Sequence, residues 1–193
     1  MRSLVGSIID KAPVPLSSAA SRLTAGMGGS RNDAVGQLQA FGRVGTLFGI
    51  VDRLATGTSK VNWALYRKRG RNPGKGERTL VEKHAALDMW DKPNPFTSRQ
   101  EFVEAYQQHQ DLTGEGWWAV GRDPRFTLPL ELWLIRPDRI APVPHPTEFI
   151  SGYVYRGPAG ELIPLGLDEV ILLKRPNPMD PYRGIGPVQS IMS

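Results

Sequence analysis

The basic stretch at residues 67–78 is the first place in this sequence where the residue types could do chemistry. It reads RKRGRNPGKGER and contains six basic residues and one acidic residue. A phosphate-binding loop needs four residues between its two glycines and a Ser or Thr directly after its lysine. Here only three residues separate Gly70 from Gly74, and no Ser or Thr follows Lys75. The spacing therefore excludes a nucleotide-binding loop of this kind.

Two interpretations of the basic stretch remain. Charge runs on turns are usually soluble surface, which favours a solvent-exposed hairpin turn. Alternatively, the stretch contacts nucleic-acid phosphates, as clustered Lys and Arg side chains do in nucleic-acid-binding proteins. The candidates for such contact are Arg67, Lys68, Arg69, Arg71, Lys75 and Arg78.

The other polar residues form no recognisable catalytic or metal-binding motif. The absence of cysteine excludes disulfides and thiolate metal sites, and three scattered histidines disfavour a zinc or iron site. Neither Gly-x-Ser-x-Gly nor His-Glu-x-x-His occurs. The central acidic residues are better explained as caps and solvated helix faces, and His84 as a packed or capping residue. These acidic residues are Asp88, Asp91, Glu101 and Glu104. We therefore predict no catalytic residues, no cofactor, no metal and no enzymatic activity.

Composition narrows the class of protein. A length of 193 residues favours one domain. A 40% hydrophobic fraction with five tryptophans is enough for a core, and a chain of this size buries roughly 70% of its unfolded surface. The formal charge of +5 permits contact with nucleic acid without requiring it. The longest apolar run, residues 44–55, is interrupted by Asp52 and Arg53 and is too short to cross a bilayer. The N-terminus lacks the apolar core of a signal peptide, so we expect no membrane contact.

Residues 84–120 organise the rest of the chain. Pro93 and Pro95 separate a short helix from a longer amphipathic helix, because proline lacks an amide donor and holds the preceding residue in extended geometry. Glycines at positions 114 and 116 end the longer helix, and a strand follows them. Two pairs of residues fit a capping box at its start: Thr97 with Gln100, and Ser98 with Glu101.

The adjacent residues Trp117 and Trp118 lie in this strand. Neighbouring side chains of a strand point to opposite faces, so only one tryptophan can line a given surface. A surface tryptophan could stack against single-stranded bases. The other tryptophan is better explained as core or as a subunit interface, where tryptophan is enriched.

The segments before residue 84 are predicted to form an arm, a helix and a strand. Residues 1–32, rich in Ser, Ala, Gly and Pro, indicate a flexible N-terminal arm. The apolar spacing of residues 33–55 predicts a helix with a wide buried face. Its glycines predict a kink near 42–45, and Gly57 is expected to end it. Residues 60–67 alternate as a half-buried strand does.

The segments after residue 120 are mostly strands. Strands are predicted at residues 130–135, 139–143, 152–156, 161–165 and 170–174. Prolines confine residues 139–143 to an edge, and the continuous apolar run at 170–174 indicates burial. Pro187 starts a helix of which only about one turn is present. The sequence thus predicts an α+β fold of mixed or antiparallel strands with a few helices. We expect the domain to span 33–186 and residues 187–193 to lead into the remainder of a longer protein.

The order of these pieces, over residues 35–190, resembles the portal proteins of tailed double-stranded DNA bacteriophages. In its first half the resemblance rests on Phe41–Ala55 running into Val61–Tyr66, on Lys92–Pro95, and on Leu112–Glu115 before the aromatic strand. In its second half it rests on Leu134–Ile140, Asp168–Lys174 and the Gly-x-x-Pro start at Gly184–Val188. The tryptophan pair departs from the family, which often has asparagine or a smaller residue and a tyrosine there.

The resemblance implies a structural subunit of a ring of roughly twelve copies at the vertex of a capsid. Such a ring forms the channel for genome packaging and ejection, and double-stranded DNA passes through it. Its expected partners are the terminase large subunit, the major capsid protein and the head–tail adaptor. Its expected location is the virion, after assembly in the host cytoplasm. This chain would supply the N-terminal arm and most of the wing domain, with the stem, clip and crown beyond it.

A ring subunit should present apolar surface that its own fold leaves uncovered. The candidates for this interface are Phe41, Phe48, Trp117 and Trp118. Two other functions remain open. One is a nucleic-acid-binding module that uses residues 67–78, and the other is a fragment of a hydrolase whose catalytic residues lie outside this chain.

Overall fold

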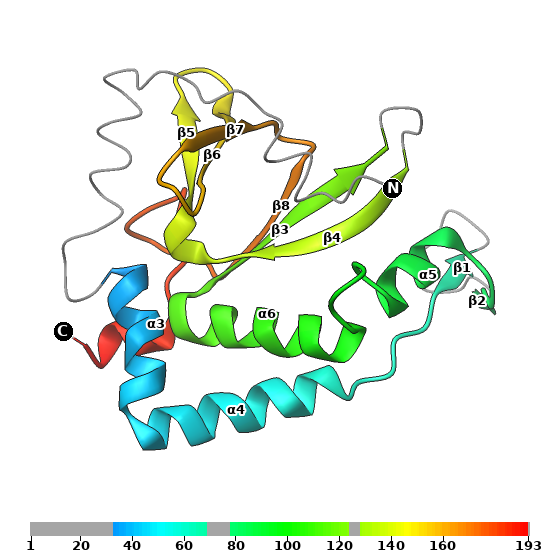
Figure 1. Ribbon diagram of the computed structural model, residues 1–193, viewed down its shortest axis with the longest axis horizontal. Coiled ribbons are helices and arrows are strands. Elements are labelled where there is room, and N and C mark those ends of the chain that lie inside the picture. The colour runs from blue at the N-terminus through cyan, green and yellow to red at the C-terminus, as the bar shows by residue number, and fades with distance from the viewer. Residues whose placement is uncertain (1–32, 69–77, 124–127, 193) are drawn as a thin grey trace.

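A computed structural model of the chain describes residues 33–68, 78–123 and 128–192 (Figure 1). The helices are α3 (Ala34–Arg43), α4 (Gly45–Ser59), α5 (Ala85–Asp91) and α6 (Arg99–Thr113), with 3-10 turns η1 (Pro137–Arg139) and η2 (Pro187–Ser190). The strands are β1 (Tyr66–Lys68), β2 (Arg78–Leu80), β3 (Glu115–Arg122), β4 (Pro129–Ile135), β5 (Ile140–His145), β6 (Phe149–Arg156), β7 (Leu162–Leu165) and β8 (Val170–Lys174). They pair in antiparallel fashion into sheets β1-β2, β4-β3-β8 and β5-β6-β7. The predicted α+β class is confirmed.

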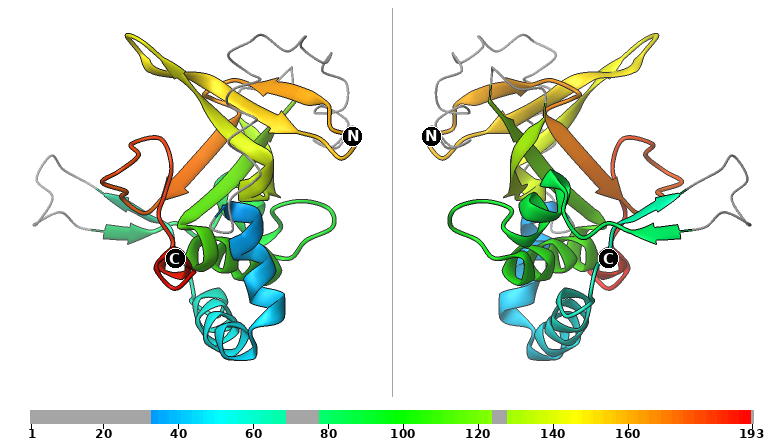
Figure 2. Two further views of the ribbon diagram at one scale, coloured as in Figure 1. Left: turned by 90° about the vertical axis from the view of Figure 1, so that its left-hand side faces the viewer. Right: turned by 90° about the vertical axis from the view of Figure 1, so that its right-hand side faces the viewer.

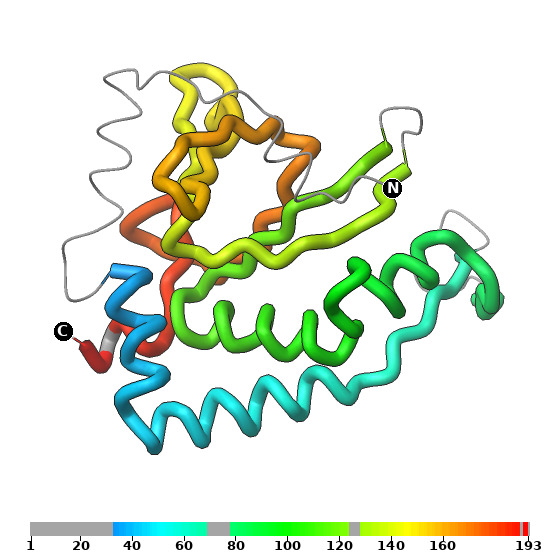
Figure 3. The backbone as a smooth tube through the Cα atoms, in the orientation of Figure 1, coloured from blue at the N-terminus to red at the C-terminus, as the bar shows by residue number. Residues whose placement is uncertain are grey.

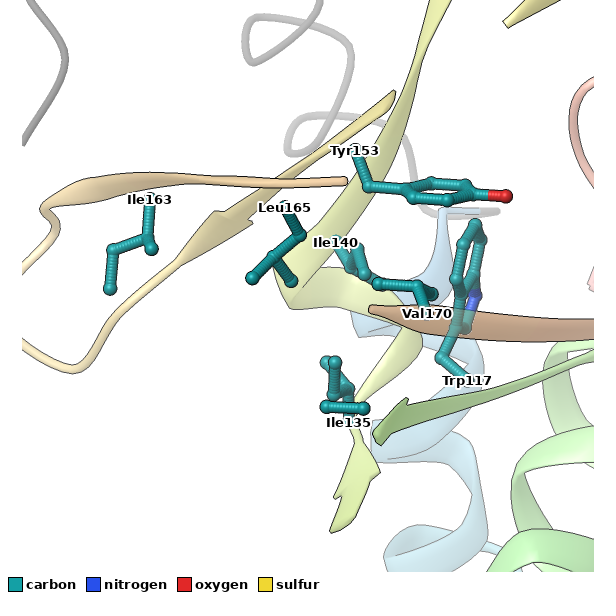
Figure 4. Close-up of a cluster of buried hydrophobic side chains, with 8 residues drawn as sticks. Trp117, Ile135, Ile140, Tyr153, Ile163, Leu165 and Val170 are labelled. Atoms are coloured by element: carbon teal, nitrogen blue, oxygen red, sulfur yellow. The ribbon is translucent and has the colours of Figure 1, made fainter. Parts of the chain in front are cut away.

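The two three-stranded sheets and the helices form layers around β3. Figure 3 shows α4 and α6 running side by side beneath the β4-β3-β8 sheet, with β5-β6-β7 above it. Trp117 of β3 is fully buried between the two sheets, where it packs against Ile140 and Tyr153 (Figure 4). Its neighbour Trp118 points the other way and packs edge-on against Phe102 of α6. Alternation along one strand therefore supplies two of the three buried clusters of the domain.

The predicted helix at 33–55 is two helices. Val44 between them has φ −112° and ψ 100°, which breaks the helical path and confirms the kink expected near 42–45. On α4, Val51, Ala55 and Ser59 are buried at a spacing of four residues, which places them on one face toward α6. Gly57 does not end α4 as predicted, because glycine also adopts helical geometry and the helix continues to Ser59.

Helices α5 and α6 begin and end as the sequence predicts. The His84 ring Nδ1 accepts a hydrogen bond from the Ala86 amide at 3.1 Å, so this histidine caps α5. Of the two capping boxes considered for α6, the structure contains the Ser98–Glu101 pair. Gly114 ends α6 with φ +77°, a conformation that favours glycine.

The two edges of the β4-β3-β8 sheet differ. At the β4 edge, the Leu132 amide donates to the Pro93 carbonyl at 2.7 Å, and Asn94 Nδ2 donates to the Leu132 carbonyl at 3.0 Å. The Pro-Asn-Pro segment thus covers this edge, which protects it from pairing with another strand. Strand β8 lies at the other edge, and its residues Ile171 and Leu173 are 39% and 36% exposed. The prediction of a buried β8 is therefore wrong for these two, because an edge strand is covered less than a central one.

The predicted half-buried strand at 60–67 is also wrong. Residues 61–65 belong to no strand, although the Leu65 carbonyl accepts a 2.9 Å hydrogen bond from the Val81 amide, and the strand β1 starts at Tyr66. Strand β1 pairs with β2, and all six residues of this hairpin are exposed. Alternation of apolar residues is present at 60–67, but the body of the domain offers no sheet for this segment to join. The predicted edge position of residues 139–143 is confirmed, since β5 is the outer strand of its sheet.

Residues 175–186, which we call the strap, fold back over the junction of α6 and β3. The backbones pass so closely that a Cβ added to Gly114 would lie 2.3 Å from the carbonyl carbon of Ile185. Beyond the strap, Pro187 opens the 3-10 turn η2, and Val188 is buried against Val51 and Leu112. The predicted helix start at Pro187 is thus a single 3-10 turn here. The boundaries predicted for the arm and domain stay predictions, and residues 1–32 lie outside the described residues.

The strap makes Gly114 more sensitive to substitution than other left-handed glycines. Gly160 has a similar φ of +87°, but a Cβ there would meet nothing within 4 Å. We expect Gly160→Ala to cost about 1 kcal/mol from backbone strain alone, and Gly114→Ala to cost roughly 3 kcal/mol or more because the strap must also move. Chemical denaturation measures both free energies of unfolding. Equal losses for the two variants would contradict the close strap contact.

Burial of His109 on α6 predicts a loss of stability in acid. Desolvation lowers the pKa of His109 to about 4, although Asp138 opposes the shift. The unfolded chain has the ordinary value near 6.5. Between these values the unfolded state binds more protons, so the free energy of unfolding should fall as the pH drops from about 6.5 to 4, by roughly 2–3 kcal/mol. Denaturation at several pH values should show a flatter slope for His109→Gln. The control His145→Gln should keep the slope, and an unchanged slope in His109→Gln would refute the assignment.

Candidate assembly surface

The described part of the chain carries no metal cluster and no membrane-spanning helix. No three His, Cys, Asp or Glu side chains gather closely enough among the described residues to hold a metal ion. Within the same ranges, no helix combines the length and apolar character needed to cross a bilayer. We therefore assign a role to each polar cluster from the hydrogen bonds and ion pairs of its side chains.

The most buried polar cluster surrounds Glu115, the first residue of β3. Its Oε1 lies 2.9 Å from Arg183 Nε and accepts a 2.6 Å hydrogen bond from the Gly184 amide. Its Oε2 accepts a 2.9 Å hydrogen bond from the Trp117 indole. Burial raises the pKa of Glu115, while the Arg183 guanidinium and these hydrogen bonds oppose the rise. Because both oxygens are occupied, this carboxylate fastens the strap to β3.

Arg183 also binds the strap to η1 and to the first residue of β5. It donates to the carbonyls of Ile140 at 2.9 Å and Pro137 at 3.3 Å, and its guanidinium carbon lies 5.9 Å from the centre of the Trp117 ring. A second ion pair joins Arg175 to Asp111 of α6 at 2.9 Å. Sequence analysis missed both pairs, because their members lie far apart along the chain and neither belongs to a recognisable motif.

A cavity of about 540 Å³ opens beside this cluster, between α3, η1, β5 and the strap. Its acidic residues serve local structure: Asp33 caps α3, Asp180 accepts amide hydrogen bonds from Tyr182 and Arg183, and Asp138 binds Arg136. The described lining residues include no histidine, serine or cysteine.

The candidate nucleic-acid contacts fall on the β1-β2 hairpin or outside the described residues. Arg67, Lys68 and Arg78 are exposed on the two strands. Arg69, Arg71 and Lys75 lie outside the described residues. The structure therefore places three of the six candidates on one exposed ribbon and does not test whether they contact nucleic acid.

Both tryptophans of the candidate interface pack inside their own chain. Trp117 is 0% exposed, so it offers no surface to a neighbour unless the core opens. Trp118 contacts Phe102, Tyr106 and Trp90, which place it between β3 and the helices. A subunit contact through either tryptophan stays a prediction, and the packing inside the chain gives each of them a role in the fold.

The two phenylalanines of the candidate interface stack at the junction of α3 and α4. Their ring centroids are 4.8 Å apart. Phe41 is partly buried against the cluster around Val51, whereas Phe48 is 47% exposed. Of the four interface candidates, Phe48 thus has the largest free surface.

Further apolar surface lies on α4 and on the segment after it. Ile50 and Leu54 are four residues apart on α4 and are 56% and 52% exposed, on a different side of the helix from the buried residues. Beyond α4, Val61 and Trp63 are 50% and 56% exposed. The apolar spacing placed Leu54 on a buried face and did not single out Ile50. The sequence contained one indication of this exposed surface: the predicted helix has more apolar residues than one buried face needs.

Comparison with known proteins supplies the class of this protein. The profile of the phage portal protein family matches residues 46–193, and the chain belongs to this family. No curated protein matches the sequence.

Solved structures share the fold. A chain from the neck of an empty GTA particle, computed with C6 symmetry, is 23% identical with a TM-score of 0.71, over 98% of this chain and 46% of that one. A chain from the virion of a native gene transfer agent (GTA) particle is 22% identical with a TM-score of 0.60, over 97% and 44% of the two chains. A chain from the neck of a native GTA particle, computed with C12 symmetry, is 22% identical with a TM-score of 0.60, over 98% and 44%. This chain therefore spans less than half the length of the chains it matches.

The burial of Trp117 and the exposure of Phe48 predict opposite effects on stability. Trp117→Ala should lower the free energy of unfolding by roughly 3–5 kcal/mol, because it leaves a cavity and removes the indole donor to Glu115. Phe48→Ala should cost only about 1 kcal/mol, the range of one aromatic pair. Chemical denaturation of both variants tests this, and a nearly neutral Trp117→Ala would contradict the core position of this residue.

Proposed function

We propose that this chain is part of a structural subunit of a portal ring at the capsid vertex of a virus-like particle. The observation that carries the proposal is the family match over residues 46–193, together with the fold shared with chains of particle necks and virions. In this role the protein forms the channel for genome packaging and ejection. It is located at the portal vertex of the virion and is assembled in the host cytoplasm.

The proposal includes the partners of such a ring. These are further copies of the chain, the terminase large subunit, the major capsid protein, the head–tail adaptor and the double-stranded DNA that passes through the channel. The solved neck structures computed with C6 and C12 symmetry support a closed ring, and we propose roughly twelve subunits. The chain contributes an arm at 1–32 and a wing domain at 33–186, and residues 187–193 lead into the stem.

No catalytic role is part of the proposal. Within the described residues, the buried carboxylate at position 115 is fully engaged by the strap, and the acidic residues of the cavity are caps and turn partners. These contacts support a protein that acts by assembly. A hydrolase would need its reacting groups elsewhere.

The exposed side of α4 supports assembly through apolar contact. Ile50 and Leu54 present two half-exposed aliphatic side chains on one side of a surface helix. Burial of both against a neighbour would contribute on the order of 2 kcal/mol per interface. In a closed ring the same contact recurs at each interface, so a small change per contact has a large effect on assembly.

Electron microscopy and sedimentation velocity of the full-length protein test this function. We expect closed rings, and we expect the double variant Ile50→Gln/Leu54→Gln to shift rings toward smaller species while circular dichroism stays unchanged. The control Arg53→Gln, an exposed polar position of the same helix, should leave rings intact. A full-length protein that stays monomeric would refute the proposed function, and normal rings in the double variant would refute the α4 contact alone.

A second candidate function, nucleic-acid binding by the hairpin, has a specific observation in its favour. Arg67, Lys68 and Arg78 are all exposed on one ribbon. Phosphate contacts release counterions, so such binding would weaken steeply with salt. Anisotropy of a labelled DNA duplex with this chain at increasing salt would detect it.

A further inference from the structure

The β1-β2 hairpin is an element that the body of its own chain leaves unsupported. All six residues of its strands are exposed, and their register pairs them with one another: Tyr66 with Leu80, Arg67 with Thr79, and Lys68 with Arg78. An isolated two-stranded hairpin is marginally stable at best in water. Such a ribbon gains stability when one of its faces is covered by a partner.

One face of the hairpin has a defined chemistry. Residues two apart in a strand share a face, so the Tyr66–Leu80 pair and the Lys68–Arg78 pair lie on the same side. Like charges directly opposite each other destabilise a strand pair. The face therefore presents a half-exposed apolar pair, 52% and 51% exposed, beside two cations that repel each other. Its matching partner is an apolar group flanked by carboxylates.

A surface of that kind lies on the opposite side of this same domain. Figure 1 looks down the shortest axis, and in the perpendicular views of Figure 2 the hairpin projects from one side while the segment between α5 and α6 projects from the other. On this segment Phe96 is 78% exposed. Exposed carboxylates precede and follow it along the chain, at Asp88, Asp91 and Glu101, and the same stretch also carries Lys92 and Arg99.

The segment between α5 and α6 is firmly held. Its residues Pro93 and Asn94 are tied to β4 through Leu132. Glu101 is fixed by its capping box with Ser98, and these hydrogen bonds lower the pKa of its carboxyl, so it stays charged. Asp91 bonds to Arg99 at 2.9 Å in an exposed pair, which competes only weakly with a further cation. Phe96 is thus presented on an ordered loop, in a stretch of chain in which three carboxylates outnumber two cations.

A closed ring needs such a pair of unlike surfaces. In a heterologous interface each subunit contributes two different patches on opposite sides, and a rotation brings one onto the other. The hairpin and the loop are opposite along the shortest axis, so copies placed face to back along that axis would bring them together.

We propose that in the portal ring the β1-β2 hairpin of one subunit docks on the α5–α6 loop of the next copy. Tyr66 and Leu80 cover Phe96, and Lys68 and Arg78 lie toward the carboxylates beside it. This inference rests on the proposed ring function and adds the elements that join its subunits. DNA backbone would satisfy the two cations but leave the apolar pair uncovered, so a second copy of the chain fits the whole face better.

The absence of cysteine from the chain allows a direct test by cross-linking. In the full-length variant Leu80→Cys/Phe96→Cys, the two thiols are carried by elements that project from opposite sides of one subunit, so a disulfide between them requires a second copy. Mild oxidation of assembled rings should therefore give a ladder of covalent oligomers on a non-reducing gel. The matched control Leu80→Cys/Ala159→Cys, with the second thiol on an exposed position of the turn between β6 and β7, should give none. Rings that form normally but yield no ladder would overturn the docking and leave the ring function standing.

Charge reversal gives an independent second test. Lys68→Glu/Arg78→Glu and Asp88→Lys/Asp91→Lys should each reduce the ring fraction in sedimentation velocity at least tenfold, and the four changes together should restore rings. The control Arg43→Glu/Arg53→Glu reverses two exposed cations on α3 and α4 and should keep rings. Intact rings in the hairpin variant would overturn the proposal. The same holds if this variant forms rings and loses only a salt-sensitive binding of a DNA duplex. Absence of rings in the unmodified protein would remove both the ring function and this inference.

Discussion

The fold depends on strand β3 being buried on both faces. One face sends Trp117 into the space between the two sheets, and the other sends Trp118 against the helices. Strand β3 also pairs with β4 on one edge and with β8 on the other, so it is the central strand of its sheet and leaves β4 and β8 as edges. The position of every other layer depends on these two adjacent side chains, because shifting the strand by one residue would exchange them.

Strand β3 also fixes the position of the strap. Glu115 begins β3, and its carboxylate fastens Arg183 and Gly184 of the strap. A buried ion pair adds little to stability when compared with apolar packing, but the loss of one partner leaves an uncompensated charge. Such a pair therefore favours one path for the strap over others.

The described surface fits a protein that works by assembly. Among its described residues, the buried carboxylates of Glu115 and Asp111 are paired with Arg183 and Arg175, and Asp180 holds a turn of the strap. Its exposed large apolar residues lie on α4, on the segment after it, on the β1-β2 hairpin and on the α5–α6 loop, and also on β4, β6, β8 and the strap. Large exposed aromatic and aliphatic groups on several projecting elements mark contact sites. Membership in the portal family gives these features a common explanation.

The sequence alone determined the local features, because caps, breaks and turns depend on neighbouring residues. The Ser98–Glu101 box, the left-handed Gly114, the break near Val44 and the edge position of β5 all result from short-range chemistry. The resemblance to portal proteins also came from ordered local pieces. Only the tertiary structure decided what each apolar run contacts. Only the last two residues of the alternating run at 60–67 enter a strand, in the exposed β1-β2 hairpin, and β8 is left at an edge. Both tryptophans pack inside the chain, and Glu115 pairs with Arg183, because folding brings distant segments together. The spacing of residues along the chain does not encode these long-range contacts.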